Sequence, residues 1–205
     1  MDTEGVIKYQ LYHTDAVLPE HLNITELNAW RTILFKLNLI GQDPLRYQGL
    51  GYGNISQRLN HSSHFIISGT QTGQLEILEK KHYCLITEAN PAHNQLHSQG
   101  LIKPSSEALT HASLYQHDNH INAVIHIHSP IIWQHTDKLK LSHTTAHIAY
   151  GTPEMANAVA ELLSSNPKIP VFTMLGHEDG VIAFGENLNT AACVLIQQLA
   201  SALAI

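Results

Sequence analysis

Two histidines at alternate positions of an apolar run are the residues whose type and spacing most directly indicate chemistry. Residues 123–130 are Ala-Val-Ile-His-Ile-His-Ser-Pro, and β-branched residues closed by Ser-Pro are typical of a buried strand. Side chains alternate between the faces of a strand, so His126 and His128 project from one face. Two imidazoles there could share a metal ion, whereas core histidines hydrogen-bonded to the backbone are the alternative. We expect Val124 and Ile127 to anchor the strand on its other face.

A third candidate ligand lies in residues 176–180, Gly-His-Glu-Asp-Gly, at a tight connection between two expected strands. A hairpin turn with polar residues would explain this segment equally well in the absence of a metal pair. Because two imidazoles on one face need a third partner to hold an ion, His177 is the leading candidate, ahead of His111, His143 and His147.

The segment 103–107, Lys-Pro-Ser-Ser-Glu, predicts an anion-binding site where a helix begins. A helix that starts at Pro104 or Ser105 has unpaired backbone N–H groups in its first turn. Those groups, the hydroxyls of Ser105 and Ser106 and the helix dipole would together bind an anion. An ordinary serine cap followed by an acidic residue is the alternative. A carboxylate beside an anion is useful only for proton transfer, which is the role we expect for Glu107.

Two glycine-containing loops could bring backbone close to the same ligand. They cover residues 49–54 and 68–73, and glycine permits such close approach. Asn54, at the end of the first loop, could donate its amide to a phosphate or a carboxylate. An asparagine that braces its own turn is the alternative.

The elements that must position these residues alternate between strands and helices. Apolar periodicity and capping residues predict helices over 24–40, 104–117, 152–164 and 187–204. Besides the histidine strand, the predicted strands cover 55–59, 65–67, 82–88, 171–175 and 181–184. This alternation predicts an α/β or α+β sandwich, and a chain of 205 residues with 43% hydrophobic content can bury one sizeable core. We therefore expect a single domain over residues 1–205.

Composition excludes several classes of function. The net charge of −6 argues against binding to nucleic acid or to anionic lipid, and no run approaches the roughly 20 apolar residues of a membrane span. The acidic start, Met-Asp-Thr-Glu, is unlike a signal peptide, so we expect a cytoplasmic protein. Cys84 and Cys193 lie far apart in apolar surroundings, which favours reduced core cysteines over a disulfide.

Several short motifs, in this order, resemble the class II aldolase/adducin family over about residues 30–185. They are Gly53-Asn54-Ile55-Ser56, Ser68-Gly69-Thr70, Pro104-Ser105-Ser106-Glu107 with His111 and Tyr115, His126-Ile127-His128-Ser129-Pro130, Tyr150-Gly151-Thr152-Pro153-Glu154, and His177 before Gly180. The resemblance implies an α/β/α sandwich around a mostly antiparallel sheet. It also implies a homo-oligomer, often a cyclic homotetramer with sites at subunit interfaces.

The resemblance further implies roles for particular residues of these motifs. In the metal-dependent sugar-phosphate aldolases of this family, His126, His128 and His177 would hold Zn²⁺ and Glu107 would be the acid/base. The positions that match the family's phosphate-binding residues are Asn54, Ser68, Gly69, Ser105 and Ser106. The implied substrate is a small sugar phosphate, cleaved through an enediolate that the metal stabilises as a Lewis acid. An epimerase or dehydratase acting on a ketose phosphate is the alternative within the family.

The sequence departs from the family pattern at two places. In the family's last motif histidine directly precedes glycine, whereas here two residues separate His177 from Gly180. Asp179 therefore occupies the ligand position if Gly180 is held in register; we favour His177 because imidazole matches the other two ligands. Aldolases of the family also use a tyrosine of a neighbouring subunit as a proton donor, and this sequence has none between His128 and Tyr150.

A non-catalytic, adducin-like interaction module is the reading from another functional class. Members of that kind lose the metal-binding histidines, whereas this chain keeps His126, His128 and Glu107. The retained residues favour an enzyme.

Overall fold

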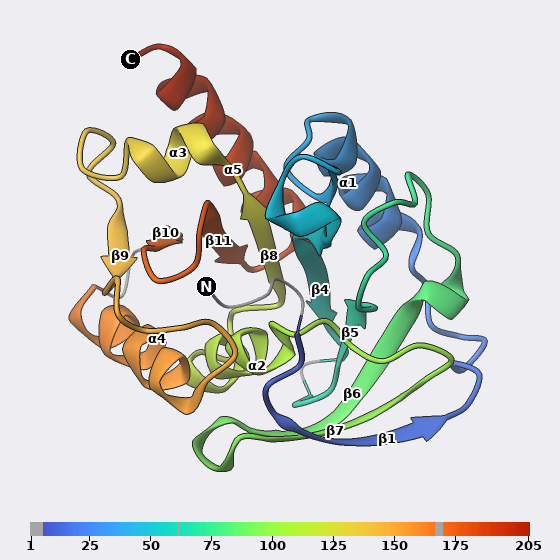
Figure 1. Cartoon of the computed structure of the whole chain (residues 1–205). Coiled ribbons are helices and arrows are strands. Elements are labelled where there is room, and N and C mark those ends of the chain that lie inside the picture. The colour runs from blue at the N-terminus through green and yellow to red at the C-terminus, as the bar shows by residue number, and fades with distance from the viewer. Residues whose placement is uncertain (1–5, 61, 167–169) are drawn as a thin grey trace.

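The structure, a computed structural model, describes residues 6–60, 62–166 and 170–205. Within these ranges one sheet runs in the order β1-β7-β6-β5-β4-β8-β11-β10-β9 (Figure 1). The strands are β1 (Gln10–Asp15), β4 (Asn54–Arg58), β5 (Phe65–Ser68), β6 (Tyr83–Asn90), β7 (Gln95–Gly100), β8 (Ala123–His128), β9 (Ser142–Thr144), β10 (Val171–Met174) and β11 (Gly180–Gly185). The pairs β1–β7 and β9–β10 at the two edges are parallel, and all other neighbours are antiparallel.

Helices cover both faces of this sheet (Figure 1). They are α1 (Thr25–Lys36), α2 (Ala108–His117), α3 (Pro130–Gln134), α4 (Pro153–Ser165) and α5 (Leu188–Leu203). Residues of α2 and α4 share one hydrophobic core with the sheet, and residues of α1, α3 and α5 share the other. A small second sheet pairs β2 (Gly41–Gln42) with β3 (Gly51–Tyr52). The predicted α/β/α sandwich around a mostly antiparallel sheet is thereby confirmed.

The histidine strand β8 lies in the middle of the sheet, between β4 and β11, and all of its residues are buried. Ile127 packs in the core with α1 and α5, on the face opposite the histidines, as predicted. The prediction was wrong for Val124, which packs in the core with α2 and α4. The reason is the two-residue period of a strand, which places Val124 on the same face as His126.

Helix α2 begins later than its sequence predicts, at Ala108, with Glu107 at its N-cap. Pro104 instead forms an isolated antiparallel bridge with Gly69, and the carbonyl of Lys103 accepts a 2.9 Å hydrogen bond from Thr70. These contacts with the 68–73 loop hold residues 103–104 in extended backbone. The two serines therefore lie just before the helix rather than within its first turn.

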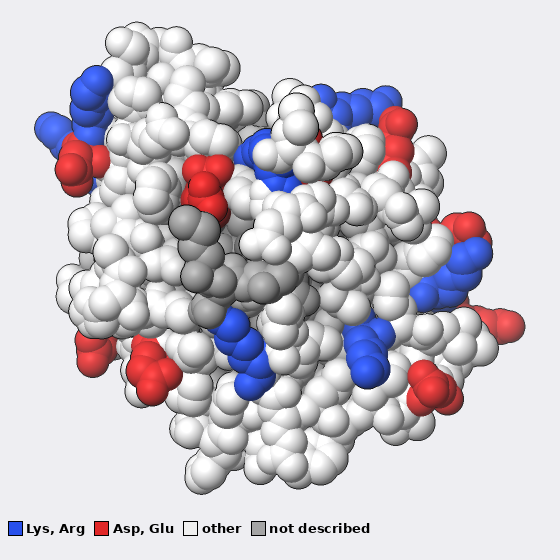
Figure 2. All heavy atoms as spheres, in the orientation of Figure 1, with Lys and Arg blue, Asp and Glu red and all other residues white. Residues whose placement is uncertain are grey.

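On the face shown in Figure 2, lysine and arginine side chains are interspersed with aspartate and glutamate, both at the rim and toward the middle. In the part of the chain that the structure describes, no helix combines the length and apolar character needed to cross a bilayer.

Candidate functional site

Three histidine side chains converge at one end of β8. One ring nitrogen from each of His126, His128 and His177 lies within 4.8 Å of those of the other two. The Nε2 atoms of His126 and His128 are 3.2 Å apart. Two nitrogen ligands, each about 2.1 Å from a tetrahedral ion, are themselves roughly 3.4 Å apart. The three histidines therefore fit a shared divalent ion.

The sheet register and one glycine bring these imidazoles together. Gly180, the first residue of β11, pairs with His128, and its N–H donates a 3.0 Å hydrogen bond to the carbonyl of His177. A Cβ atom at Gly180 would lie 3.2 Å from Cγ of His177 and 3.3 Å from Cε1 of His126. Such contacts are tighter than side chains normally make, so the absence of a side chain at Gly180 permits the approach of two rings.

Burial keeps the imidazoles in the form that binds metal. His126 is 1% exposed and His128 is fully buried. Desolvation, followed by the neighbouring His177, lowers the pKa of both histidines well below its usual value. A neutral imidazole retains the lone pair that a metal ion requires. The site is thus prepared for a cation without prior loss of a proton.

A buried carboxylate adjoins the histidines. Glu107, at the N-cap of α2, is 1% exposed, and its Oε1 lies 3.6 Å from Nδ1 of His177. The ring of His177 also stacks on the ring of Tyr150, with centroids 4.4 Å apart. Three imidazoles that could hold a metal ion thus lie beside a carboxylate that could exchange a proton.

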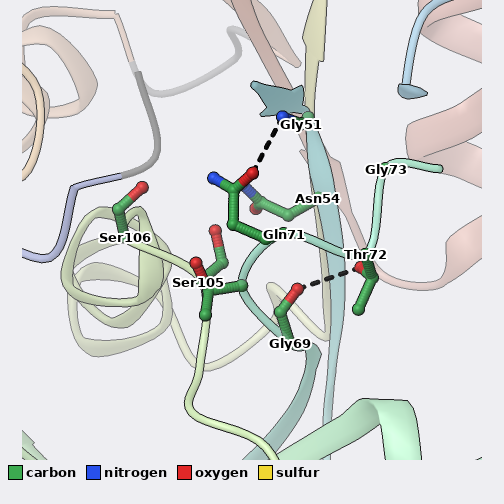
Figure 3. A pocket seen from close by; sticks show the side chains of 10 residues that line it. Gly51, Asn54, Gly69, Gln71, Thr72, Gly73, Ser105 and Ser106 are labelled. Atoms are coloured by element: carbon green, nitrogen blue, oxygen red, sulfur yellow. Dashed lines mark hydrogen bonds between the residues drawn. The ribbon is translucent and has the colours of Figure 1, made fainter. Parts of the chain in front are cut away.

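A small polar pocket lies beside this group (Figure 3). Its lining residues are Gly51, Gly53, Asn54, Gly69, Thr70, Gln71, Thr72, Gly73, Ser105 and Ser106. Four of the five residues predicted to bind phosphate are among them. The fifth, Ser68, is buried next to the pocket, and its hydroxyl accepts a 3.2 Å hydrogen bond from the N–H of Ile55. None of the described lining residues carries a formal charge, so the pocket offers hydrogen-bonding groups rather than a counter-ion.

The pocket adjoins the histidines through neighbouring backbone. Asn54 of β4 pairs with His126 of β8, and Ser106 directly precedes Glu107. Asn54 is 4% exposed, and no hydrogen bond to its Oδ1 is made by the described residues. Side chains of Asn54, Gln71 and Ser106 surround the same space in Figure 3. A ligand bound there would have its other end near the histidines.

The 68–73 loop contributes two side chains to the pocket lining that the sequence does not predict, those of Gln71 and Thr72. The Gln71 side chain accepts a 3.0 Å hydrogen bond from the N–H of Gly51, and the Thr72 hydroxyl donates a 3.0 Å hydrogen bond to the carbonyl of Gly69. The glycine content of both loops indicated close backbone approach, but nothing in the pattern distinguished Gln71 or Thr72 as lining residues.

Arg31 of α1, which is 1% exposed, binds the end of this loop and the residues that follow it. Its guanidinium donates to the carbonyls of Thr72 (3.0 Å), Glu76 (2.7 Å) and Leu75. We predict that Arg31→Met lowers the free energy of unfolding by about 3 kcal/mol, because buried carbonyls lose their donors. Urea denaturation measures this change. A loss of less than about 0.5 kcal/mol, the size typical of surface substitutions, would contradict it.

The structure also brings to the site a segment that sequence reasoning missed. Tyr47, in the short helix η1 (Tyr47–Gly49), approaches the ring of His128 edge-on, with centroids 4.6 Å apart. Its hydroxyl donates a 2.5 Å hydrogen bond to Oδ2 of Asp179, the residue that the sequence left as an alternative ligand. Asp179 is outside the three-histidine group. In the sequence this segment shows only that Arg46 and Tyr47 directly precede the glycine loop 49–54, a pattern that predicts no particular site.

Comparison with known proteins identifies the family. Residues 45–203 match the class II aldolase and adducin N-terminal domain. The chain belongs to this family. Class II aldolases use a divalent metal ion, which agrees with the three-histidine group found in this member.

Solved structures of class II aldolases share the fold. An L-fuculose 1-phosphate aldolase is 18% identical, with a TM-score of 0.66 over 90% of this chain and 86% of the other. A sugar-phosphate aldolase from Thermotoga maritima is 17% identical, with a TM-score of 0.66 over 88% of this chain and 93% of the other. YgbL from Escherichia coli, a putative aldolase/epimerase/decarboxylase, is 21% identical, with a TM-score of 0.63 over 88% and 86%. No curated protein sequence matches the chain.

Proposed function

We propose that this protein is a zinc-dependent lyase that cleaves a carbon–carbon bond of a small phosphorylated sugar. The observation that carries the proposal is the group of three buried histidines beside Glu107, which adjoins a neutral polar pocket. His126, His128 and His177 are the proposed ligands. Their nitrogens suit zinc, whereas magnesium and calcium prefer oxygen ligands.

Each part of the site has a proposed task. A divalent ion held by the three imidazoles would supply Lewis acidity, which stabilises negative charge that develops on substrate oxygens. Glu107 takes up and returns the proton at the reacting carbon, and its burial excludes the water that would compete for this proton. The pocket fixes the phosphate and so holds the reacting end in register. Its proposed ligands are Asn54, Ser68, Gly69, Ser105 and Ser106.

Product analysis tests the proposed reaction. The metal-loaded protein is incubated with a panel of ketose and aldose phosphates and with the same sugars lacking phosphate. We expect an aldehyde and a shorter phosphorylated ketone to form from one of the phosphorylated sugars. Formation of an epimer or a dehydrated sugar without shorter products would contradict the proposed cleavage of a carbon–carbon bond. Equal turnover of the unphosphorylated sugar would contradict the phosphate site.

A single substitution tests the pocket separately from the metal. We predict that Asn54→Asp raises KM for the phosphorylated substrate about tenfold or more, because it places a carboxylate in a buried anion site. Asn189→Asp, an exposed change of the same type on α5, is the matched control. Steady-state kinetics measure both variants. An unchanged KM for Asn54→Asp would show that the phosphate binds elsewhere.

The whole chain, residues 1–205, is proposed to form one domain that works as a homo-oligomer, in keeping with the often tetrameric assembly of the family. A cytoplasmic location and the absence of nucleic-acid or membrane partners are part of the same proposal.

A further inference from the structure

A flap made of residues 41–52 lies beside the end of β8 and β4 (Figure 1). Pairing of β2 with β3 closes the base of this flap. Both tyrosines of the flap lie against the ring of His128. The ring centroid of Tyr47 is 4.6 Å from that of His128, and the ring centroid of Tyr52 is 5.5 Å from it. The flap therefore forms one wall of the histidine site.

The backbone of the flap adopts a conformation that its side chains disfavour. Tyr47 has a φ of 48° and Gln48 a φ of 59°, both in the left-handed region that residues with a Cβ rarely occupy. Asp179, the hydrogen-bond partner of Tyr47, has a φ of 62°. Conformations of this kind persist where surrounding contacts hold them, and they cluster at functional sites. The contacts that hold Tyr47 in place should accordingly matter to the site.

Those contacts form a compact, largely shielded cluster of three side chains. The Tyr47 hydroxyl donates to Oδ2 of Asp179 at 2.5 Å and accepts from Nη2 of Arg46 at 2.6 Å. Arg46 Nη2 lies 3.7 Å from the same carboxylate oxygen, and the two charged side chains are 26% and 11% exposed. Hydrogen bonds to charged groups are the strong ones, and limited contact with solvent strengthens them further.

We propose that Asp179 is a positioning residue that acts through Tyr47 and holds the ring of Tyr47 against His128. Its carboxylate binds Tyr47 and Arg46 of the flap. In this way Asp179 restricts the orientation of His128, a proposed metal ligand, without being a ligand itself. Partners of this kind tune metal affinity because they restrict the ring that supplies the lone pair. The inference rests on the proposed metal site, and it assigns a task to the residue that replaces histidine directly before Gly180.

Removal of one hydroxyl tests the proposal. Tyr47→Phe keeps the ring beside His128 and deletes both hydrogen bonds of its hydroxyl, the one donated to Asp179 and the one accepted from Arg46. We expect the affinity for Co²⁺, measured by chelator competition, to fall about tenfold, the lower end of the cost of losing a group hydrogen-bonded to a ligand, because this hydroxyl acts on the ligand through the ring of Tyr47. The visible absorption of bound Co²⁺ should change as well, because it reports ligand geometry.

Tyr52→Phe is the matched control on the same flap. The Tyr52 hydroxyl is outside the cluster, and its only described hydrogen bond, to the carbonyl of Asn38, is 3.5 Å long. We expect its Co²⁺ affinity to stay within about twofold of wild type, since no strong hydrogen bond is lost. Equal losses in Tyr47→Phe and Tyr52→Phe would overturn the specific role of Asp179.

Asp179→Asn separates positioning from ligation. If both residues act through one hydrogen bond, Tyr47→Phe combined with Asp179→Asn should bind Co²⁺ about as weakly as the weaker of the two single variants. If Asp179 were itself a ligand, Asp179→Asn would abolish binding while Tyr47→Phe would not, and the proposal would be wrong. His126→Ala is the reference. If His126→Ala binds Co²⁺ as the wild type does, the proposed metal site is wrong. If His126→Ala loses the ion while Tyr47→Phe and Asp179→Asn keep wild-type affinity, only the positioning role of Asp179 is wrong.

Discussion

Glu107→Gln is expected to lower kcat by about 10²- to 10⁴-fold, the usual contribution of a general acid/base. Glu107 is 1% exposed and lies 3.6 Å from His177, so no solvent molecule can readily take over its proton. The carboxamide has nearly the same shape, which preserves packing at the N-cap of α2. The measurement is the initial rate on whichever sugar phosphate the wild type cleaves fastest.

The metal content of Glu107→Gln separates proton transfer from loss of the site. Glu107 is outside the three-histidine group, so this variant should bind as much metal as the wild type. Glu154→Gln, at an exposed position in the first turn of α4, is the control and should turn over normally. Wild-type turnover in Glu107→Gln would exclude Glu107 as the acid/base.

His126→Ala and His128→Ala are each expected to lower zinc affinity on the order of 1,000-fold and to abolish turnover. Zinc sites held by a few side chains bind with about 10–16 kcal/mol, so the loss of one ligand removes several kcal/mol. Both histidines are buried in the central strand, so a water molecule or another side chain cannot easily replace the imidazole that is lost. Competition with a chromophoric chelator measures the affinity.

His143→Ala is the matched control, because His143 of β9 is exposed and outside the three-histidine group. Its zinc affinity should equal that of the wild type. Circular dichroism of the metal-free variants verifies that each still folds. Unchanged affinity in His126→Ala and His128→Ala would mean that these histidines are structural.

The sequence predicted the elements with strong periodicity and the side on which their histidines project. The alternation around His126 and His128 correctly placed both rings on one face of a buried strand. Strands β1 and β7 were not predicted. Their sequences, Gln-Leu-Tyr-His-Thr-Asp and Gln-Leu-His-Ser-Gln-Gly, are too polar at an edge of the sheet for hydrophobic pattern alone to identify them.

Other features depend on contacts between distant segments and could not be read from local pattern. The start of α2 is delayed because Pro104 pairs with Gly69, a contact that crosses 35 positions of the sequence. The hydrogen bond between Tyr47 and Asp179 joins residues 132 positions apart. The location of His177 beside His128 follows from the pairing of β11 with β8, which a single sequence does not specify.

The metal content of the untagged wild-type protein tests the central claim most directly. The protein is dialysed against zinc, freed of excess ion by gel filtration and analysed by mass spectrometry for metal per chain. We predict about one zinc per chain, lost when His126 and His128 are both replaced by alanine, because a group of three imidazoles holds one ion. A wild-type protein without bound metal, or equal metal content in that double variant, would contradict the account.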